Sequence, residues 1–265
     1  MKKQGISSFL RKLRLLHLAD KVRFYVQQFK NRKANSEFKV EHPEVKLPPD
    51  YLIYESFQID YHKYYVQSKE GANKLVQLFA KHIDLKDKKV LDWGCGPGRI
   101  VRHLPELIGN NCSYYGTDYN AKTIQWCTKN LPEINFNTNT LEANLPYEDN
   151  FFDVTYGMSI FTHLSEELHH QWYAELFRIL KPGGIMMLTT QGDIYKAKMT
   201  PVELEQYNKG ELVIRGQVAE GHRIFSAFQP KEFMTKLFSN ATVVEHIEQP
   251  PVGKWYPQDM WIIRK

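Results

Sequence analysis

The stretch Val90-Leu-Asp-Trp-Gly-Cys-Gly-Pro-Gly-Arg99 decides the fold of this 265-residue chain. An apolar run that is typical of a short buried strand leads into three glycines at alternate positions, and a helical pattern follows. Glycine lets a backbone turn tightly and approach a ligand without a Cβ atom in the way. A ligand at this turn would lie at the carboxyl end of the strand, against the amino terminus of a helix. A dinucleotide-binding turn needs Gly or Ala where Arg99 stands, so the stretch disfavours a dehydrogenase.

Strands and helices alternate on both sides of this turn. The patterns predict strands at residues 89–92, 113–118, 134–137, 152–156 and 185–190, and helices at 70–83, 97–108, 121–130 and 166–180. A further helix at 230–238 and two strand-like runs at 242–248 and 260–264 end the chain. This alternation predicts an α/β fold, a Rossmann-like doubly wound and mostly parallel sheet with helices on both faces.

Two regions do not follow the alternation. Residues 1–48 are interpreted as a basic helical arm with a linker at 31–46, which is polar and is punctuated by Pro43, Pro48 and Pro49. Residues 192–228 show no clear period and are too long for an ordinary connection. We therefore predict a catalytic domain over residues 49–265, with a lid or acceptor-binding insertion at about 192–228.

Charge is distributed unevenly along the chain. Residues 1–33 carry ten Lys or Arg against one acid, a net charge of +9, so the rest of the chain, with 25 against 29, carries −4. A mildly acidic body is a poor candidate for a nucleic-acid groove, and we expect no nucleic-acid partner. Apolar residues recur at helical spacing among the cations of the arm. Such a segment can lie on an anionic membrane surface or pack on its own domain, and the pattern leaves both open.

Several classes of protein are disfavoured by composition. No apolar run approaches the roughly 18 residues that span a bilayer, and no signal-peptide pattern follows the basic start. Three cysteines, Cys95, Cys112 and Cys127, form no CxxC pair, which suits a reducing compartment. No His/Asp cluster has metal-ligand spacing, so no metal is expected. We predict a cytoplasmic protein with possible peripheral contact, through residues 1–33, with the inner face of the membrane.

A second chemical signal lies twenty residues beyond Gly98. Asp118 ends the second predicted strand, where a carboxylate can accept hydrogen bonds from both hydroxyls of a ribose. Nicotinamide cofactors and S-adenosylmethionine both contain a ribose. Asp118 therefore indicates a nucleoside ligand without choosing between them.

Five segments in order resemble the class I S-adenosylmethionine-dependent methyltransferases, in particular those of small-molecule and polysaccharide pathways. They are Leu91-Asp-Trp-Gly-Cys-Gly-Pro-Gly98, Gly116-Thr-Asp118, Asn144-Leu-Pro-Tyr-Glu-Asp-Asn-Phe-Phe-Asp153, Phe161-Thr-His-Leu164 and Leu180-Lys-Pro-Gly-Gly184. The match covers about residues 70–190. The resemblance implies that the last two strands form an antiparallel hairpin, and that the cofactor is S-adenosyl-L-methionine.

The resemblance also implies which residues form the sites. Its cofactor site would consist of Asp92, Gly94, Cys95, Gly96, Gly98, Asp118, Tyr119, Asn139 and Ser159. Asn139 is chosen for the adenine amino group, with Glu142 as the alternative. The expected acceptor-binding residues are Tyr61, Tyr65, His222 and Arg223.

His163 is the candidate general base, because an imidazole just past the fourth strand could take a proton from a hydroxyl near neutral pH. The alternative is a histidine that only packs or caps. The favoured function is O-methylation of a small molecule, a sugar or a lipid-linked glycan. N-methylation of a small amine or a macromolecule, and a non-catalytic partner protein with this fold, remain open.

Overall fold

The computed structural model describes residues 16–216, 225–253 and 255–265. Contacts between residues divide the chain into two compact units, Met1–Ser68 and Lys69–Lys265. None of the helices in the described ranges is both long enough and apolar enough to cross a membrane. Each unit is considered separately.

The first unit is helical. It contains α2 (Leu16–Glu41), α3 (Asp50–Phe57) and the short π-helix η1 (Lys63–Gln67). The side chains that form its core are Phe38, Ile53, Tyr54, Ile59, Tyr61 and Tyr64.

The predicted linker at residues 31–46 is wrong over most of its length, because α2 continues to Glu41. The polar side chains that suggested a linker bind backbone of the same unit. Asn31 donates to the carbonyl oxygens of Gln58 and Ile59, and the buried Asn35 also donates to Ile59. An amide side chain that satisfies buried carbonyls stabilises a helical segment that looks too polar to pack.

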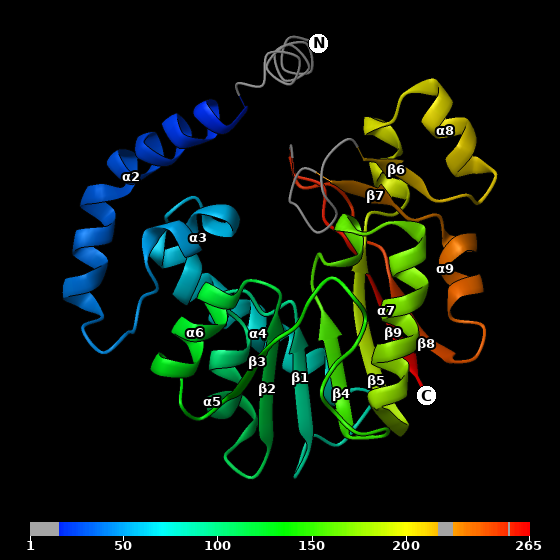
Figure 1. The fold of residues 1–265 in the computed structure, drawn as a ribbon, viewed down its shortest axis with the longest axis horizontal. Helices are drawn as coiled ribbons and strands as arrows, with labels where there is room; N and C mark the ends of the chain where they lie inside the picture. The colour runs from blue at the N-terminus through cyan, green and yellow to red at the C-terminus, as the bar shows by residue number, and fades with distance from the viewer. Residues whose placement is uncertain (1–15, 217–224, 254) are drawn as a thin grey trace. The chain divides into compact units, whose positions relative to one another are not determined.

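The second unit is built on a seven-stranded sheet (Figure 1). The strand order is β3-β2-β1-β4-β5-β9-β8, and all pairs are parallel except those that β9 makes with β5 and β8. Its strands are β1 (Lys89–Trp93), β2 (Ser113–Asp118), β3 (Asn135–Thr138), β4 (Phe152–Gly157), β5 (Leu180–Thr190), β8 (Thr242–Ile247) and β9 (Asp259–Arg264). The predicted Rossmann-like sheet and its antiparallel hairpin at the end of the chain are both confirmed.

Helices cover both faces of this sheet. They are α4 (Ser68–Ala80), α5 (Leu104–Ile108), α6 (Ala121–Asn130), α7 (Glu166–Ile179) and α9 (Lys231–Leu237). One buried cluster joins α7 and α9 to the sheet, and a second joins α4, α5 and α6 to it. The helices therefore pack on both faces of the sheet, as a doubly wound fold requires.

Two predicted elements differ in length. The predicted helix at 97–108 is only α5, preceded by turns and one 3-10 turn at Val101–His103. Positive φ angles of 51° at Gly96 and 71° at Gly98 hold the chain out of the helical region before it. β5 begins at Leu180 and not at residue 185, because the segment after α7 already pairs with β4 at Phe152.

The segment with no clear period contains short elements. They are η4 (Asp193–Lys198), α8 (Pro201–Asn208), β6 (Val213–Arg215) and β7 (Ser226–Phe228), and β6 pairs with β7 in a separate antiparallel sheet. Thr200 and Glu203 form a reciprocal capping box that starts α8. In Figure 1 the arrows of β2 and β4 point to the edge of the sheet beyond which α8, β6 and β7 lie. The insertion therefore stands at the carboxyl ends of the parallel strands.

Candidate functional site

The glycine turn after β1 is fastened to the end of β2. The backbone nitrogens of Gly94 and Cys95 both donate to the carbonyl oxygen of Thr117, over 2.8 and 3.0 Å. Gly94, Gly96 and Gly98 have φ angles of 74°, 51° and 71°. Residues other than glycine adopt this left-handed backbone conformation only with strain. The backbone of the turn therefore explains why glycine stands at these three positions.

Two of these glycines face different surroundings. A Cβ atom on Gly94 would lie 2.1 Å from Cδ1 of Ile160, an overlap that neither residue could avoid without moving. A Cβ atom on Gly96 would meet no atom within 4 Å. A side chain at Gly94 would therefore collide with its neighbour, whereas a side chain at Gly96 would extend into open space.

The Asp118 carboxylate ties the turn to the next helix. Its Oδ2 accepts a hydrogen bond from the nitrogen of Gly96 over 2.9 Å, and its Oδ1 accepts from the nitrogen of Asn120 over 2.8 Å. Asn120 in turn caps α6 with its own side chain. Each carboxylate oxygen can accept a further bond, so a ligand hydroxyl can share a group that already organises the turn.

Asp92 lies beneath the turn and is 3% exposed. Its Oδ2 has no hydrogen-bond partner among the described residues. Burial raises the pKa of Asp92 to about 7, the Tyr156 hydroxyl and the Arg99 guanidinium oppose that rise, and the Asp118 charge adds to it. A buried acid with an unpartnered oxygen fits a site that receives a cationic or hydrogen-donating group.

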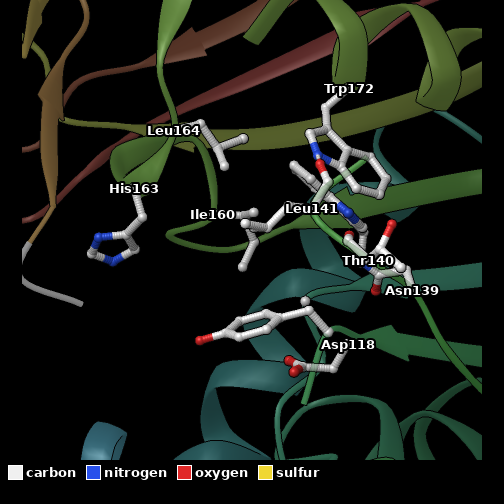
Figure 2. Close-up of a pocket in the computed structure, with 11 residues that line it drawn as sticks. Asp118, Asn139, Thr140, Leu141, Ile160, His163, Leu164 and Trp172 are labelled. Atoms are coloured by element: carbon white, nitrogen blue, oxygen red, sulfur yellow. Dashed lines mark hydrogen bonds between the residues drawn. The ribbon is translucent and has the colours of Figure 1, made fainter. Parts of the chain in front are cut away.

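One cavity opens beside the turn (Figure 2). The side chains and backbone that line it are Trp93, Gly94, Asp118, Tyr119, Asn139, Thr140, Leu141, Ile160, His163, Leu164 and Trp172. Five predicted site residues, Gly94, Asp118, Tyr119, Asn139 and His163, thus meet in one place, in segments that end or follow four strands. Its apolar walls, among them Leu141 and Trp172, were not predicted. No motif marks them.

Asn139 is held firmly at the polar end of the cavity. Its Oδ1 accepts from the hydroxyl of Thr117 over 2.8 Å, and its Nδ2 donates to the carbonyl of Thr140 over 2.7 Å. Tyr119 is 52% exposed at the mouth. Glu142, the alternative to Asn139, is exposed and does not line the cavity.

Five predicted cofactor residues do not line the cavity: Asp92, Cys95, Gly96, Gly98 and Ser159. Gly98 packs against Leu131, and Cys95 is buried with its thiol close to Gly116, where burial raises its pKa well above the ordinary value. Ser159 directly precedes Ile160, which lines the cavity, and has a left-handed conformation with φ of 66°. Their direct contact with a ligand stays a prediction.

Ser159 belongs to a hydrogen-bonded group that joins three strand ends. Its backbone nitrogen donates to the Thr189 hydroxyl over 2.7 Å, and its own hydroxyl donates to Oε1 of Gln258 over 2.9 Å. Thr189 also donates to that oxygen, over 2.6 Å. The sequence pattern did not indicate Gln258, because its partners are distant in the chain.

His163 lies on the far side of Ile160 from Asp118 and Asn139 in Figure 2. Its Nδ1 lies 2.7 Å from the carbonyl oxygen of Phe225. A carbonyl only accepts, so Nδ1 carries the proton, and the neutral ring has its basic lone pair on Nε2. This tautomer is the one that a general base needs if Nε2 faces the substrate.

A second, buried histidine supports the turn that carries His163. Nδ1 of His169 donates to the Ser165 carbonyl, and its Nε2 accepts from the Gln229 amide over 3.0 Å. Burial lowers the pKa of His169 to about 4, so the ring is neutral at physiological pH. The same Gln229 nitrogen donates to the Phe161 carbonyl at the start of the turn.

The predicted acceptor residues are only partly described. Tyr61 and Tyr65 belong to the first unit, where Tyr61 is buried and donates from its hydroxyl to Asp50 over 2.7 Å. His222 and Arg223 lie outside the described residues. A role for these four in acceptor binding stays a prediction.

The hairpin of β8 and β9 brings together three residues that the sequence spacing did not single out. Potential ligand atoms of His246, Glu248 and Asp259 all lie within 4.8 Å of one another. The His246 ring stacks on Trp261 with centroids 3.6 Å apart, and its Nε2 lies 3.2 Å from Asp259. Ring stacking and this hydrogen bond account for the arrangement without an ion.

The segment that carries this site matches one protein family in sequence. Residues 90–184 match the model of a family described as a methyltransferase domain. A phthiotriol/phenolphthiotriol dimycocerosates methyltransferase of Mycobacterium ulcerans is 32% identical over 156 residues, which cover 54% of this chain and 55% of that protein. The chain therefore matches about half the length of this relative.

Solved structures agree on the fold. A protein of Pyrococcus horikoshii superimposes with a TM-score of 0.56 at 18% identity, covering 82% of this chain and 99% of that one. An S-adenosylmethionine-dependent methyltransferase of Methanosarcina mazei superimposes with a TM-score of 0.55 at 16% identity, covering 71% and 96%.

Proposed function

We propose that this chain, which carries a class I S-adenosylmethionine-dependent methyltransferase domain, methylates a hydroxyl group of a small molecule, a sugar or a lipid-linked glycan. The observation that carries the choice of a hydroxyl acceptor is the hydrogen bond from His163 to the Phe225 carbonyl. A hydroxyl must lose its proton during transfer, and a histidine held in the right tautomer at the cavity supports that step.

The residues around the cavity fit the cofactor. Gly96 leaves open space where a side chain would stand, and Asp118 offers lone pairs for the two ribose hydroxyls. The unpartnered Oδ2 of the buried Asp92 suits a cationic amino group. Trp172 and Leu141 supply apolar walls for a flat base. When bound, S-adenosylmethionine supplies an electrophilic methyl group on a sulfonium.

The chain itself contributes alignment, a proton acceptor and exclusion of water. Orientation of the acceptor hydroxyl in line with the reacting carbon removes an entropic barrier. Nε2 of His163 accepts the hydroxyl proton while Nδ1 stays hydrogen-bonded to Phe225, and this bond stabilises the imidazolium that forms. The insertion at 192–228 supplies both that carbonyl and a cover over the strand ends.

The acceptor class is supported by the chemistry around the insertion and by one relative. The Lys198 ammonium lies over the rings of the buried Tyr195 and of Tyr256, at 4.6 and 4.0 Å from their centroids. Aromatic faces beside polar groups suit sugar rings and lipid headgroups. The Mycobacterium ulcerans relative is named for phthiotriol and phenolphthiotriol dimycocerosates. We further propose that the enzyme works in the cytoplasm at the inner face of the membrane, where the basic residues 1–33 would hold it.

Calorimetric titration of the full chain with S-adenosylmethionine, S-adenosylhomocysteine and NAD tests the cofactor site. Saturable binding of both adenosyl compounds and none of NAD is expected. Mass spectrometry of acceptor mixtures, with a mass increase of one methyl group, then identifies the acceptor. Failure of a well-folded protein to bind either adenosyl compound would rule out the proposed activity.

N-methylation is the second candidate function. An amine acceptor is itself nucleophilic once neutral and needs less from a base. The two candidates therefore differ in how strongly activity depends on His163.

A further inference from the structure

The helix α2 has two faces, and its own unit uses only one of them. On the inner face the Phe24 ring packs edge-on against Tyr54, with centroids 5.2 Å apart. Asn35 donates to the Ile59 carbonyl over 2.8 Å, and Phe38 is 4% exposed. These contacts account for one side of the helix and leave the other side to be explained.

The outer face carries a line of exposed apolar side chains. Val22, Tyr25, Val26, Phe29 and Val40 are 55%, 56%, 55%, 80% and 80% exposed. At 3.6 residues per turn these positions fall within about 100° of arc, the width of an amphipathic stripe. They make up five of the thirteen large exposed apolar side chains of the described residues. Single exposed apolar residues need no explanation, whereas a continuous stripe marks an interaction surface.

Cations border this stripe on both sides. By the same helical geometry, Lys21 and Arg32 lie along one edge, and Arg23 and Lys30 lie along the other. Between residues 16 and 36 the single acid is Asp20, which accepts a hydrogen bond from Tyr54 on the inner face. By the same geometry Lys33 lies within the stripe, where it pairs with Glu37 over 3.8 Å. The apolar centre is therefore continuous from Val22 to Phe29, with Val40 apart from it, and the charges that border this continuous part are cationic.

We propose that the outer face of α2 docks on an anionic membrane surface. Apolar side chains in the centre of the face would enter the boundary of the acyl chains, and the bordering Lys and Arg would contact lipid phosphates. Charge complementarity favours this occupant over a second copy of the chain, because pairing two such faces would bring cations together. The inference rests on the proposed function for its purpose, access to a membrane-bound acceptor, but docking itself requires neither cofactor nor acceptor.

Co-sedimentation of the full chain with phosphatidylcholine vesicles, with and without phosphatidylglycerol, tests this directly. We expect binding to the anionic vesicles that weakens as salt rises. The double variants Val26→Ser/Phe29→Ser and Arg23→Gln/Lys30→Gln should each lower the partition coefficient on the order of tenfold. Val202→Ser, at a site that is 76% exposed on α8, is the matched control and should bind like the wild type.

Three results would overturn the proposal. One is absence of wild-type binding to anionic vesicles. Another is binding that both double variants retain in full, which would place it outside this face. The third is a wild-type dimer, in sedimentation velocity without lipid, that Val26→Ser/Phe29→Ser converts to a monomer. S-adenosylhomocysteine titration and thermal unfolding of the same samples show whether each variant is folded, and separate a failure of docking from a failure of the cofactor site.

Discussion

Nδ1 of His163 lies 2.7 Å from the carbonyl oxygen of Phe225, although 62 positions separate the two residues in the sequence. His163 follows β4, and Phe225 directly precedes β7 in the insertion. The tautomer of the candidate base is therefore set by a residue of the insertion. An insertion that orients the base can couple binding of an acceptor beneath it to readiness for proton transfer.

We expect His163→Ala to lower turnover of a hydroxyl acceptor by at least about a hundredfold, because general base catalysis contributes that much or more. Affinity for S-adenosylhomocysteine should stay within about twofold of wild type, since the Asp118 end of the cavity is intact. Initial rates and calorimetry on the same samples measure both. Unimpaired turnover by His163→Ala would instead support an amine acceptor.

Gln229→Leu should lower the free energy of unfolding by about 2–4 kcal/mol, since it leaves buried groups of His169 and Phe161 without partners. Urea denaturation measures this change. Gln171→Leu, at an exposed site on α7, should change stability by less than about 0.5 kcal/mol. Equal losses of stability in the two variants would show that the hydrogen bonds of Gln229 to His169 and Phe161 do not stabilise the fold.

Asp118→Ala should weaken binding of S-adenosylmethionine and S-adenosylhomocysteine alike, by at least about tenfold. The carboxylate both orients the Gly96 nitrogen and offers lone pairs to a ribose. Calorimetry gives the two dissociation constants, with Glu205→Gln on the exposed side of α8 as the control. A variant that binds as tightly as the wild type would remove Asp118 from the cofactor site.

Gly94→Ala and Gly183→Ala form a matched pair. Both glycines have positive φ, 74° and 78°, so each alanine should cost about 1–2 kcal/mol of backbone strain. Only at Gly94 does the new Cβ overlap Ile160. We expect Gly94→Ala to be the more destabilising in thermal unfolding and to weaken cofactor binding, and Ile160→Ala to recover part of the stability. Equal loss in both variants would contradict the packing of this turn.

The raised pKa of Asp92 predicts how stability depends on pH. With a folded pKa of about 7 against 3.8 for an exposed carboxyl, the native state holds a proton that the unfolded state has already lost. The contribution of this group to the free energy of unfolding is therefore fully present below about pH 4, and it is lost as the pH rises towards 7. Asp92→Asn should remove this loss, so its stability relative to wild type should be greater at pH 8 than at pH 5, by up to a few kcal/mol. Urea denaturation at the two values tests the sign, and a constant difference would contradict it.

Local pattern was enough to predict the architecture. Alternating strands and helices, the glycine turn after β1 and Asp118 at the end of β2 were all found where expected. Each depends on residues close together in the chain, where periodicity and glycine placement act directly on the backbone. The predicted helix at 97–108 was wrong because positive φ at the glycines extends the turn into it.

Only the tertiary structure decided the rest. The apolar walls of the cavity, the partner of His163, the Gln258 contacts and the two faces of α2 all join residues that are distant in sequence. The asparagines of α2 illustrate the reason. Taken alone they favour a linker, and they become helix-stabilising only because carbonyl groups of another segment need donors. The amino-acid sequence by itself thus determined the order of elements and the cofactor turn, whereas packing between distant segments decided what each polar side chain contacts, because those partners exist only once the chain is folded.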